Sequence, residues 1–229
     1  MSDYHYLAIR EKIEKKILQT GRKLTEVELI AVTKFQSQET MKQLYQEGCR
    51  HFAESRAQEG LAKIASFVHE PDWHFIGRLQ KNKVSKVAAH FDFIHSVDSL
   101  SLAQEISKAG QRLEKKIAIL LQVNVSLEPS KQGLTASDWE EQLSSLNELP
   151  ALKVIGLMTM APFTSDDTKV RSCFKTLYSL REKWRPFMPQ PTLFTHLSMG
   201  MSNDYLIAIE EGATLLRIGS ALFRSNANG

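Results

Sequence analysis

The sequence has few cysteines, no long apolar run and no dense stretch of basic charge. Its 229 residues include two cysteines, Cys49 and Cys173, which lack the spacing of a disulfide framework or a zinc site. We therefore expect free thiols, no bound metal and a reducing, cytoplasmic location. No apolar run approaches the ~20 residues that span a bilayer, and residues 3–17 read as a charged helix rather than a signal peptide. We expect no membrane association.

Charge and composition set further limits. The net charge of +3 falls short of the basic stripe that predicts nucleic acid binding, and it suits a small anionic ligand equally well. Hydrophobic residues make up 42% and charged residues 24%, so a sizeable core can form. The chain also lacks a linker, a low-complexity tract or a break in composition. We expect a single domain over residues 1–229, and a monomer.

Short apolar runs recur along the chain, each followed by a helical pattern. The runs are Leu29–Thr33, His51–Glu54, Trp73–Gly77, Phe93–Val97, Ile117–Val125, Val154–Met160, Leu193–Ser198 and Leu215–Gly219. Several are continuously apolar, as is typical of parallel strands covered on both faces. The helical patterns cover Thr40–Glu47, Ala57–Phe67, Lys81–Ala89, Leu100–Lys115, Ser137–Leu146, Thr168–Trp184 and Asn203–Glu211. Ser137 and Ser202 stand where N-caps are expected.

Eight strands alternating with helices in about 230 residues favour a single (β/α)₈ barrel, an α/β fold, with the barrel proper at about residues 27–224. The alternative is an open doubly wound sheet. That fold predicts a G-x-G-x-x-G turn after the first strand, whereas Lys34 follows it here. An extra helix at residues 3–20 is expected to cover the bottom or the side of the barrel.

The active site of a barrel lies at the carboxyl ends of its strands, so the residues there are the candidates. They are Lys34, Glu54, Ser55, His74, Gly77, Ser96, Asp98, Asn124, Ser126, Met158, Thr159, Ser198, Gly200, Arg217, Gly219 and Ser220. Lys34 has two interpretations. By itself it reads as a surface lysine beside a strand. At a barrel mouth, partial burial lowers the pKa of a lysine, and the neutral amine attacks a carbonyl.

Two segments favour the second interpretation. Leu197-Ser-Met-Gly-Met-Ser202 ends the seventh strand, and Arg217-Ile-Gly-Ser220 ends the eighth. Glycines let the backbone approach a ligand, hydroxyls donate hydrogen bonds, and helix N-termini attract anions. Barrels often bind phosphate after strands seven and eight. Together with Lys34, these segments predict a phosphorylated carbonyl compound, either pyridoxal 5′-phosphate (PLP) or a sugar phosphate.

The segment from Trp73 to Lys83 combines His74 with a basic stretch, which we interpret as a solvated helix face. Glu54 and Asp98 are candidate acid/base groups, although capping of the next helix suits Asp98 better.

These residues resemble the pyridoxal phosphate homeostasis protein family, in order from about residue 6 to residue 223. The matching segments are Ala31-Val-Thr-Lys34, Trp73-His-Phe-Ile-Gly77, Leu79-Gln80, Asn82-Lys83, His95-Ser-Val-Asp98, Val123-Asn-Val-Ser126, Lys131-Gln-Gly133, Gly156-Leu-Met-Thr159, Leu197-Ser-Met-Gly-Met-Ser202 and Arg217-Ile-Gly-Ser-Ala-Leu-Phe223. The chain departs from the family at Phe52-Ala-Glu-Ser55, where Phe-Gly-Glu-Asn is usual, and at Ser220, where Thr is common.

The resemblance implies a barrel like the N-terminal domain of alanine racemase, with PLP held as a Schiff base on Lys34. It implies phosphate contacts from Ser198, Gly200, Gly219 and Ser220. It places Arg217 near the pyridine nitrogen. The remaining ring contacts fall on Ser55, His74, Asn124 and Met158.

Three functions follow as hypotheses. The first is a carrier that limits free PLP and hands it to apo-enzymes without substantial catalysis, so no residue is expected to be catalytic. The second is a PLP-dependent amino-acid racemase, and the third is a Schiff-base aldolase. A racemase of this kind takes a second base from another domain, which we expect this chain to lack because it ends at Gly229. Arg217 at the ring nitrogen cannot accept a proton, which leaves the ring a weaker electron sink.

Overall fold

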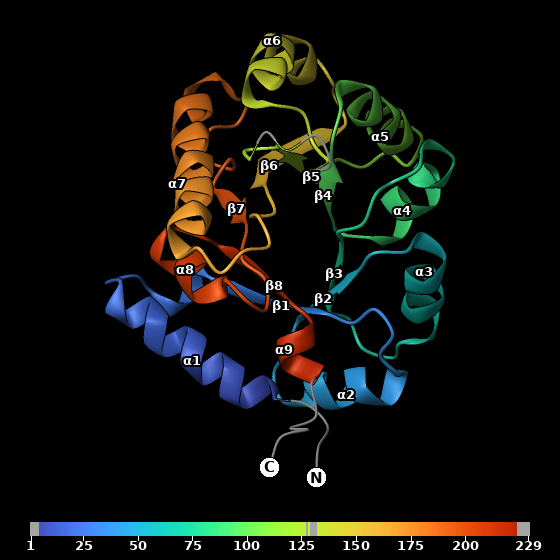
Figure 1. Cartoon of the computed structure of the whole chain (residues 1–229). Coiled ribbons are helices and arrows are strands. Elements are labelled where there is room, and N and C mark those ends of the chain that lie inside the picture. The colour runs from blue at the N-terminus through green and yellow to red at the C-terminus, as the bar shows by residue number, and fades with distance from the viewer. Residues whose placement is uncertain (1–4, 127, 129–131, 224–229) are drawn as a thin grey trace.

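The computed structural model describes residues 5–126, 128 and 132–223, and its strands close into one parallel barrel (Figure 1). The strands are β1 (Glu28–Val32), β2 (His51–Glu54), β3 (Asp72–Phe75), β4 (Phe93–Val97), β5 (Ile117–Gln122), β6 (Leu152–Met158), β7 (His196–Ser198) and β8 (Leu215–Ile218). Neighbours follow chain order, and β8 closes on β1. The (β/α)₈ prediction is confirmed and the open sheet is excluded. Lys131 and residue 224 lie outside the described residues.

Helices form a ring around the strands (Figure 1). They are α1 (Tyr6–Gln19), α2 (Gln38–Gln46), α3 (Ala57–Ser66), α4 (Val84–His90), α5 (Leu100–Arg112), α6 (Ala136–Asn147), α7 (Asp167–Trp184), α8 (Tyr205–Glu210) and α9 (Ser220–Phe223). Short 3₁₀ turns cover Leu24–Glu26, Lys81–Lys83 and Arg185–Phe187. Within the described part of the chain, no helix combines the length and apolar character needed to cross a membrane.

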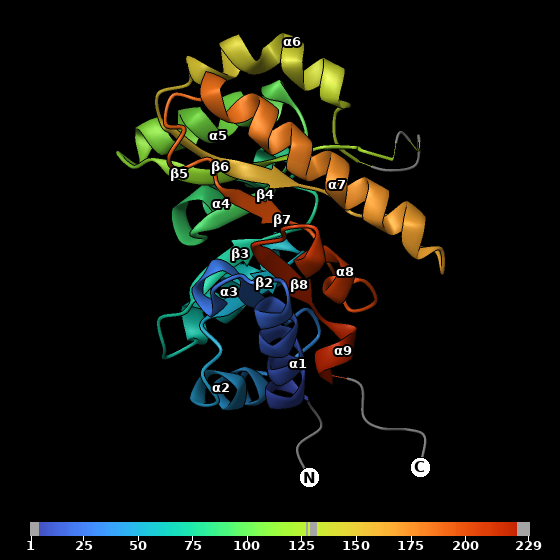
Figure 2. The ribbon, with the colours of Figure 1, turned by 90° about the vertical axis from the view of Figure 1, so that its left-hand side faces the viewer.

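The extra helix α1 covers the side of the barrel next to α8 and α9 (Figure 2). Its buried residues Ile9, Ile13 and Ile17 recur at four-residue spacing, which makes one apolar stripe. Lys16 Nζ donates to Glu210 Oε1 at 2.6 Å. Of the two positions expected from the sequence, the side is therefore the one occupied.

The pleat of β1 decides which of its side chains face the inside of the barrel. Ile30 and Val32 belong to a small inner cluster, whereas Ala31 packs in the outer core between strands and helices. Alternation with a period of two therefore directs Lys34 toward the barrel mouth. The other members of the inner cluster are Ala53, Leu120, Ile155, Met158 and Leu215.

Two predicted caps are wrong. Helix α6 is capped by Thr135 rather than Ser137, because Asp138 and Thr135 hydrogen-bond to each other's backbone amides in a capping box. Helix α8 begins after Asp204, and the Ser202 hydroxyl instead accepts hydrogen bonds from the turn after β8. Strand β7 is also shorter than predicted, since a turn with a Leu193 N to Gln190 O bond precedes it.

Candidate functional site

Lys34 stands where β1 ends and the chain turns away from the barrel. The ladder continues one residue past the strand, because Thr33 N donates to Ala53 O at 3.0 Å. Phe35 then adopts a left-handed conformation with φ of 69°, which costs a non-glycine residue roughly 1 kcal/mol. The Lys34 side chain is exposed, so its amine is accessible at the mouth.

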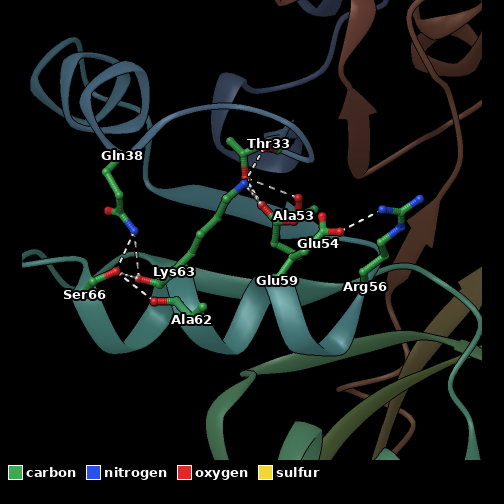
Figure 3. Close-up of polar contacts among 9 residues, drawn as sticks. All are labelled: Thr33, Gln38, Ala53, Glu54, Arg56, Glu59, Ala62, Lys63 and Ser66. Atoms are coloured by element: carbon green, nitrogen blue, oxygen red, sulfur yellow. Dashed lines mark hydrogen bonds and ion pairs between the residues drawn. The ribbon is translucent and has the colours of Figure 1, made fainter.

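A buried ion pair fixes the backbone immediately before Lys34 (Figure 3). Lys63 Nζ on α3 donates to Thr33 O at 2.7 Å and to Glu54 Oε1 at 2.8 Å. The Thr33 hydroxyl donates to the same Glu54 oxygen at 2.7 Å. Glu54 is fully buried and turned away from the mouth toward α3, so the structure does not support its candidate acid/base role. Its contacts instead hold the end of β1 in place.

Arg217 on β8 is a buried cation whose hydrogen-bond acceptors among the described residues are neutral. Its Nη1 donates to Ser198 Oγ at 2.5 Å, and its Nη2 donates to Thr159 O at 2.9 Å. Within the described residues no ion pair joins Arg217 to a carboxylate. Burial lowers the pKa of the guanidinium to about 10, and the negative charge of Asp204 opposes this shift. Arg217 lies opposite Ile30 in the β8–β1 register, on the barrel wall that leads up to Lys34.

The turns after β7 and β8 approach each other and β1. A Cβ atom on Gly219 would lie 3.4 Å from Val32 Cβ. Gly219 N and Ala221 N both point at Ser202 Oγ, at 3.3 and 3.0 Å. Convergent backbone amides of this kind suit the oxygens of an anion. Ser220 is exposed on the same turn. Sequence reasoning omitted Ser202 from the phosphate contacts, although it ends the motif that carried the prediction.

Gly200 lies in the turn after β7, where there is no space for a side chain. Its φ is 92°, and an added Cβ would lie 2.6 Å from Ala208 Cβ. Its carbonyl accepts from Arg217 N at 3.0 Å, which ties the turn after β7 to β8.

Ser198 does not present a free hydroxyl to the mouth. Its side chain is fully buried, and Oγ contacts both Arg217 and His95 Nδ1, the latter at 2.8 Å. A phosphate contact by Ser198 remains a prediction, and in this structure its hydroxyl contacts Arg217 instead.

His95 is the functional candidate that sequence reasoning missed. It is fully buried, and its Nε2 lies 2.9 Å from His74 Nδ1. Burial lowers the pKa of both histidines well below the usual value, with the positive charge of Arg217 adding to the effect at His95. The sequence signal that could have identified His95 is the two-residue alternation of β4, which places Phe93 and His95 on one face.

The remaining predicted ring contacts lie in different surroundings. His74 is buried and stacks on Phe93, with ring centroids 4.6 Å apart. Met158 belongs to the inner cluster. Asn124 Nδ2 donates to Glu128 O at 3.0 Å within the loop after β5. Ser55 lies along a surface hollow beside Arg56. Ring contacts by these four residues remain predictions.

Comparisons with known proteins agree with this arrangement. The model of the alanine racemase N-terminal domain family matches residues 10–227. The pyridoxal phosphate homeostasis protein of Aquifex aeolicus is 37% identical over 216 residues, which is 94% of each chain. That of Synechocystis is 40% identical over 200 residues, covering 86% of this chain and 90% of its own.

A solved structure with bound ligand is also similar. PipY of Synechococcus elongatus, with PLP bound, superposes with a TM-score of 0.82 at 34% identity, covering 92% of this chain and 99% of its own. With a family model that spans nearly the whole barrel and relatives at 37% and 40% identity, the chain belongs to the pyridoxal phosphate homeostasis protein family, built on the alanine racemase N-terminal domain.

Proposed function

We propose that this protein binds PLP through Lys34 and acts in intracellular PLP homeostasis as a carrier without substantial catalysis. The observation that carries the proposal is the pairing, on adjacent strands, of an accessible lysine at the end of β1 with a buried arginine on β8. A site of this kind can take one ligand that offers a carbonyl to the amine and an acceptor to the guanidinium.

The residues present fit the cofactor at both of its ends. When bound, PLP supplies an aldehyde carbon and an electron-withdrawing pyridine ring. Lys34 holds it covalently, as the predicted Schiff base. The Gly219 and Ala221 amides, with Ser202 and Ser220, bind the phosphate. Because Arg217 has no carboxylate partner among the described residues, an unprotonated ring nitrogen is a suitable acceptor for it.

This donor set favours a carrier over the racemase alternative. A guanidinium donates and cannot accept a proton, so Arg217 keeps the ring nitrogen unprotonated and limits carbanion chemistry. We further propose PLP-dependent apo-enzymes as the recipients, neither nucleic acid nor membrane as a partner, and a monomer built as a single domain. The cytoplasm is the proposed location, consistent with a sequence that has only two cysteines and lacks the spacing of a disulfide framework.

Covalent attachment is tested by reconstitution with PLP, borohydride reduction and mass spectrometry of the peptides. We expect the label on Lys34 and visible absorbance before reduction. Lys34→Ala should lose both while the ligand-free variant melts as the parent does, because the side chain is exposed. Lys42→Ala, which removes an exposed lysine of α2, is the matched control. A label on another lysine would overturn the assignment.

Transfer is tested by mixing the loaded protein with a PLP-dependent apo-enzyme and a trap for free PLP. Activity should return despite the trap. If the trap abolishes reconstitution, the protein is only a buffer. If the loaded protein interconverts amino-acid enantiomers at about 1 per second or faster, the racemase alternative replaces the carrier.

A further inference from the structure

Three histidines connect the buried Arg217–Ser198 pair to the opposite end of the barrel. Beyond Ser198, the contacts run from His95 Nδ1 to Ser198 Oγ at 2.8 Å, from His74 Nδ1 to His95 Nε2 at 2.9 Å, and from His51 Nδ1 to His74 Nε2 at 3.2 Å. The three histidines belong to β4, β3 and β2. We call this series the histidine chain.

The histidine chain reaches solvent at the amino-terminal ends of the strands. His51 is the first residue of β2, and its side chain is 19% exposed. Its Nε2 lies 3.4 Å from Glu28 Oε2, and its Nδ1 lies 3.3 Å from Asp72 Oδ2. Glu28 and Asp72 open β1 and β3, so carboxylates face His51 from both neighbouring strands. His196, the first residue of β7, also acts electrostatically on His74 and His95.

Elementary hydrogen-bond rules fix the direction in which the groups of the histidine chain donate and accept. A guanidinium only donates, so Ser198 Oγ accepts from Arg217 and has its own proton to give to His95 Nδ1. A neutral imidazole donates from one nitrogen and accepts at the other. His95 then donates from Nε2 to His74 Nδ1, and His74 donates from Nε2 to His51 Nδ1. The Nε2 proton of His51 then faces the Glu28 carboxylate, whose Oε2 lies 3.4 Å away.

The opposite direction conflicts with the hydroxyl at the inner end of the histidine chain. It would turn the Ser198 proton away from His95 and leave that proton without its partner in the histidine chain. The outer end does not discriminate, because each direction places a bare His51 nitrogen beside a carboxylate: Nδ1 lies 3.3 Å from Asp72 Oδ2, and Nε2 lies 3.4 Å from Glu28 Oε2. The Ser198 proton therefore sets the order that runs from Arg217 to Glu28.

We propose that His95, His74 and His51 are positioning residues that fix the direction of the Ser198 hydroxyl and thereby hold the Arg217 guanidinium against the ligand ring. The proposal rests on the proposed function, since Arg217 is the residue assigned there to the ring nitrogen. If a substitution removes the His51 imidazole from the histidine chain, His74 Nε2 loses its hydrogen-bond acceptor. His74 and His95 can then exchange tautomers, and Ser198 becomes free to rotate beneath Arg217.

The direction is tested in the ligand-free protein by NMR of ¹⁵N-labelled histidine, assigned with single-site variants. We expect His95 and His74 each to be a single neutral tautomer, protonated at Nε2 and bare at Nδ1. A proton on Nδ1 of either ring, or an imidazolium at neutral pH, would overturn the proposal. This measurement needs neither PLP nor a substitution at His51, the outer end of the histidine chain.

The effect on the site is tested with His51→Phe, His51→Asn and the control His90→Phe on the exposed surface of α4. Phenylalanine removes the acceptor for His74, whereas the asparagine oxygen restores one near the position of Nδ1. In His51→Phe we expect mixed tautomers at His74 and His95. We also expect the pH at which the absorbance of bound PLP changes to move by about 0.5 unit or more. His51→Asn and His90→Phe should behave as the parent does.

The outcomes separate the two proposals. If the NMR result is as expected but His51→Phe leaves the pH profile of the absorbance unchanged, the histidine chain has only a structural role and the proposed positioning role is wrong. If Lys34 takes no label in the parent, the proposed function fails, while the tautomers still report on the chain. A shift in His51→Phe that His51→Asn does not reverse would indicate lost packing rather than a lost acceptor.

Discussion

At the scale of single residues, the Glu54 carboxylate holds the end of β1 in place rather than acting as an acid or base. It is fully buried, and its Oε2 has no hydrogen-bond partner among the described residues. Oε1 takes both Lys63 Nζ and the Thr33 hydroxyl. Burying an ion pair carries a large desolvation cost. Removing one partner destabilises the fold further, because it leaves the other charge buried and unpaired. Lys63 therefore stabilises the fold mainly by compensating the buried charge of Glu54.

Replacing Lys63 by methionine should destabilise the protein by about 3 kcal/mol or more, because it leaves a buried, unpaired carboxylate. The matched control is Lys108→Met in the exposed Lys108–Glu105 pair, where the loss should stay below about 1 kcal/mol. Urea unfolding measures both. Adding Glu54→Gln to Lys63→Met should recover part of the loss. Equal, small losses in the two lysine variants would contradict the structural role of Lys63.

At the scale of elements, the turn after β7 is shaped by close packing against α8. Gly200 has a left-handed backbone, and the helix occupies the space where a side chain would lie. The same residue accepts from Arg217 N, so a shift of this turn would also move β8. The proposed phosphate contacts on the two turns thus depend on one glycine.

Gly200→Ala should destabilise the protein by about 2–4 kcal/mol, because backbone strain of roughly 1 kcal/mol adds to overpacking of 1–3 kcal/mol. Gly21→Ala is the matched control, since Gly21 has a φ of 72° and nothing within 4 Å of an added Cβ. It should lose only the strain, about 1 kcal/mol. Thermal melting of the ligand-free variants compares them. If the two variants lost the same stability, close packing at Gly200 would not matter.

At the scale of the whole molecule, the barrel interior holds titratable groups in their neutral form. Burial is the largest cause of the low pKa of His74, His95 and His196. The folded protein therefore binds fewer protons at these rings than the unfolded chain does below the ordinary histidine pKa of about 6.5. Their stabilising effect is complete above that pH and is lost as the pH falls below it.

The free energy of unfolding should accordingly fall between pH 7.5 and pH 5.5, by about 1.4 kcal/mol for each histidine that stays neutral when folded. Asp72 and Asp204, whose pKa values are raised by burial, act in the opposite sense and reduce the net loss. Urea unfolding at the two pH values measures the difference. The exposed-site variant His90→Phe should keep the slope of the parent, and a flat profile in the parent would contradict neutral interior histidines.

The sequence by itself determined the alternation of strands and helices, because each apolar run and each helical stripe is a local pattern. It also located Lys34, since counting along one strand is enough to find its end. The turns after β7 and β8 were recognisable from glycine and serine in short motifs. The caps of α6 and α8 were misread, because neighbouring hydroxyl residues compete for the same position.

Only the tertiary structure decided which polar side chains meet. Glu54 was predicted from its place at a strand end, but the pleat turns it outward, where Lys63 reaches it from the next helix. Ser198 and Arg217 are 19 residues apart, and Ser198 and His95 are 103 residues apart. Their contacts depend on the register of strands around a closed barrel. No local pattern encodes that register, because it is fixed by how all eight strands pack together at once.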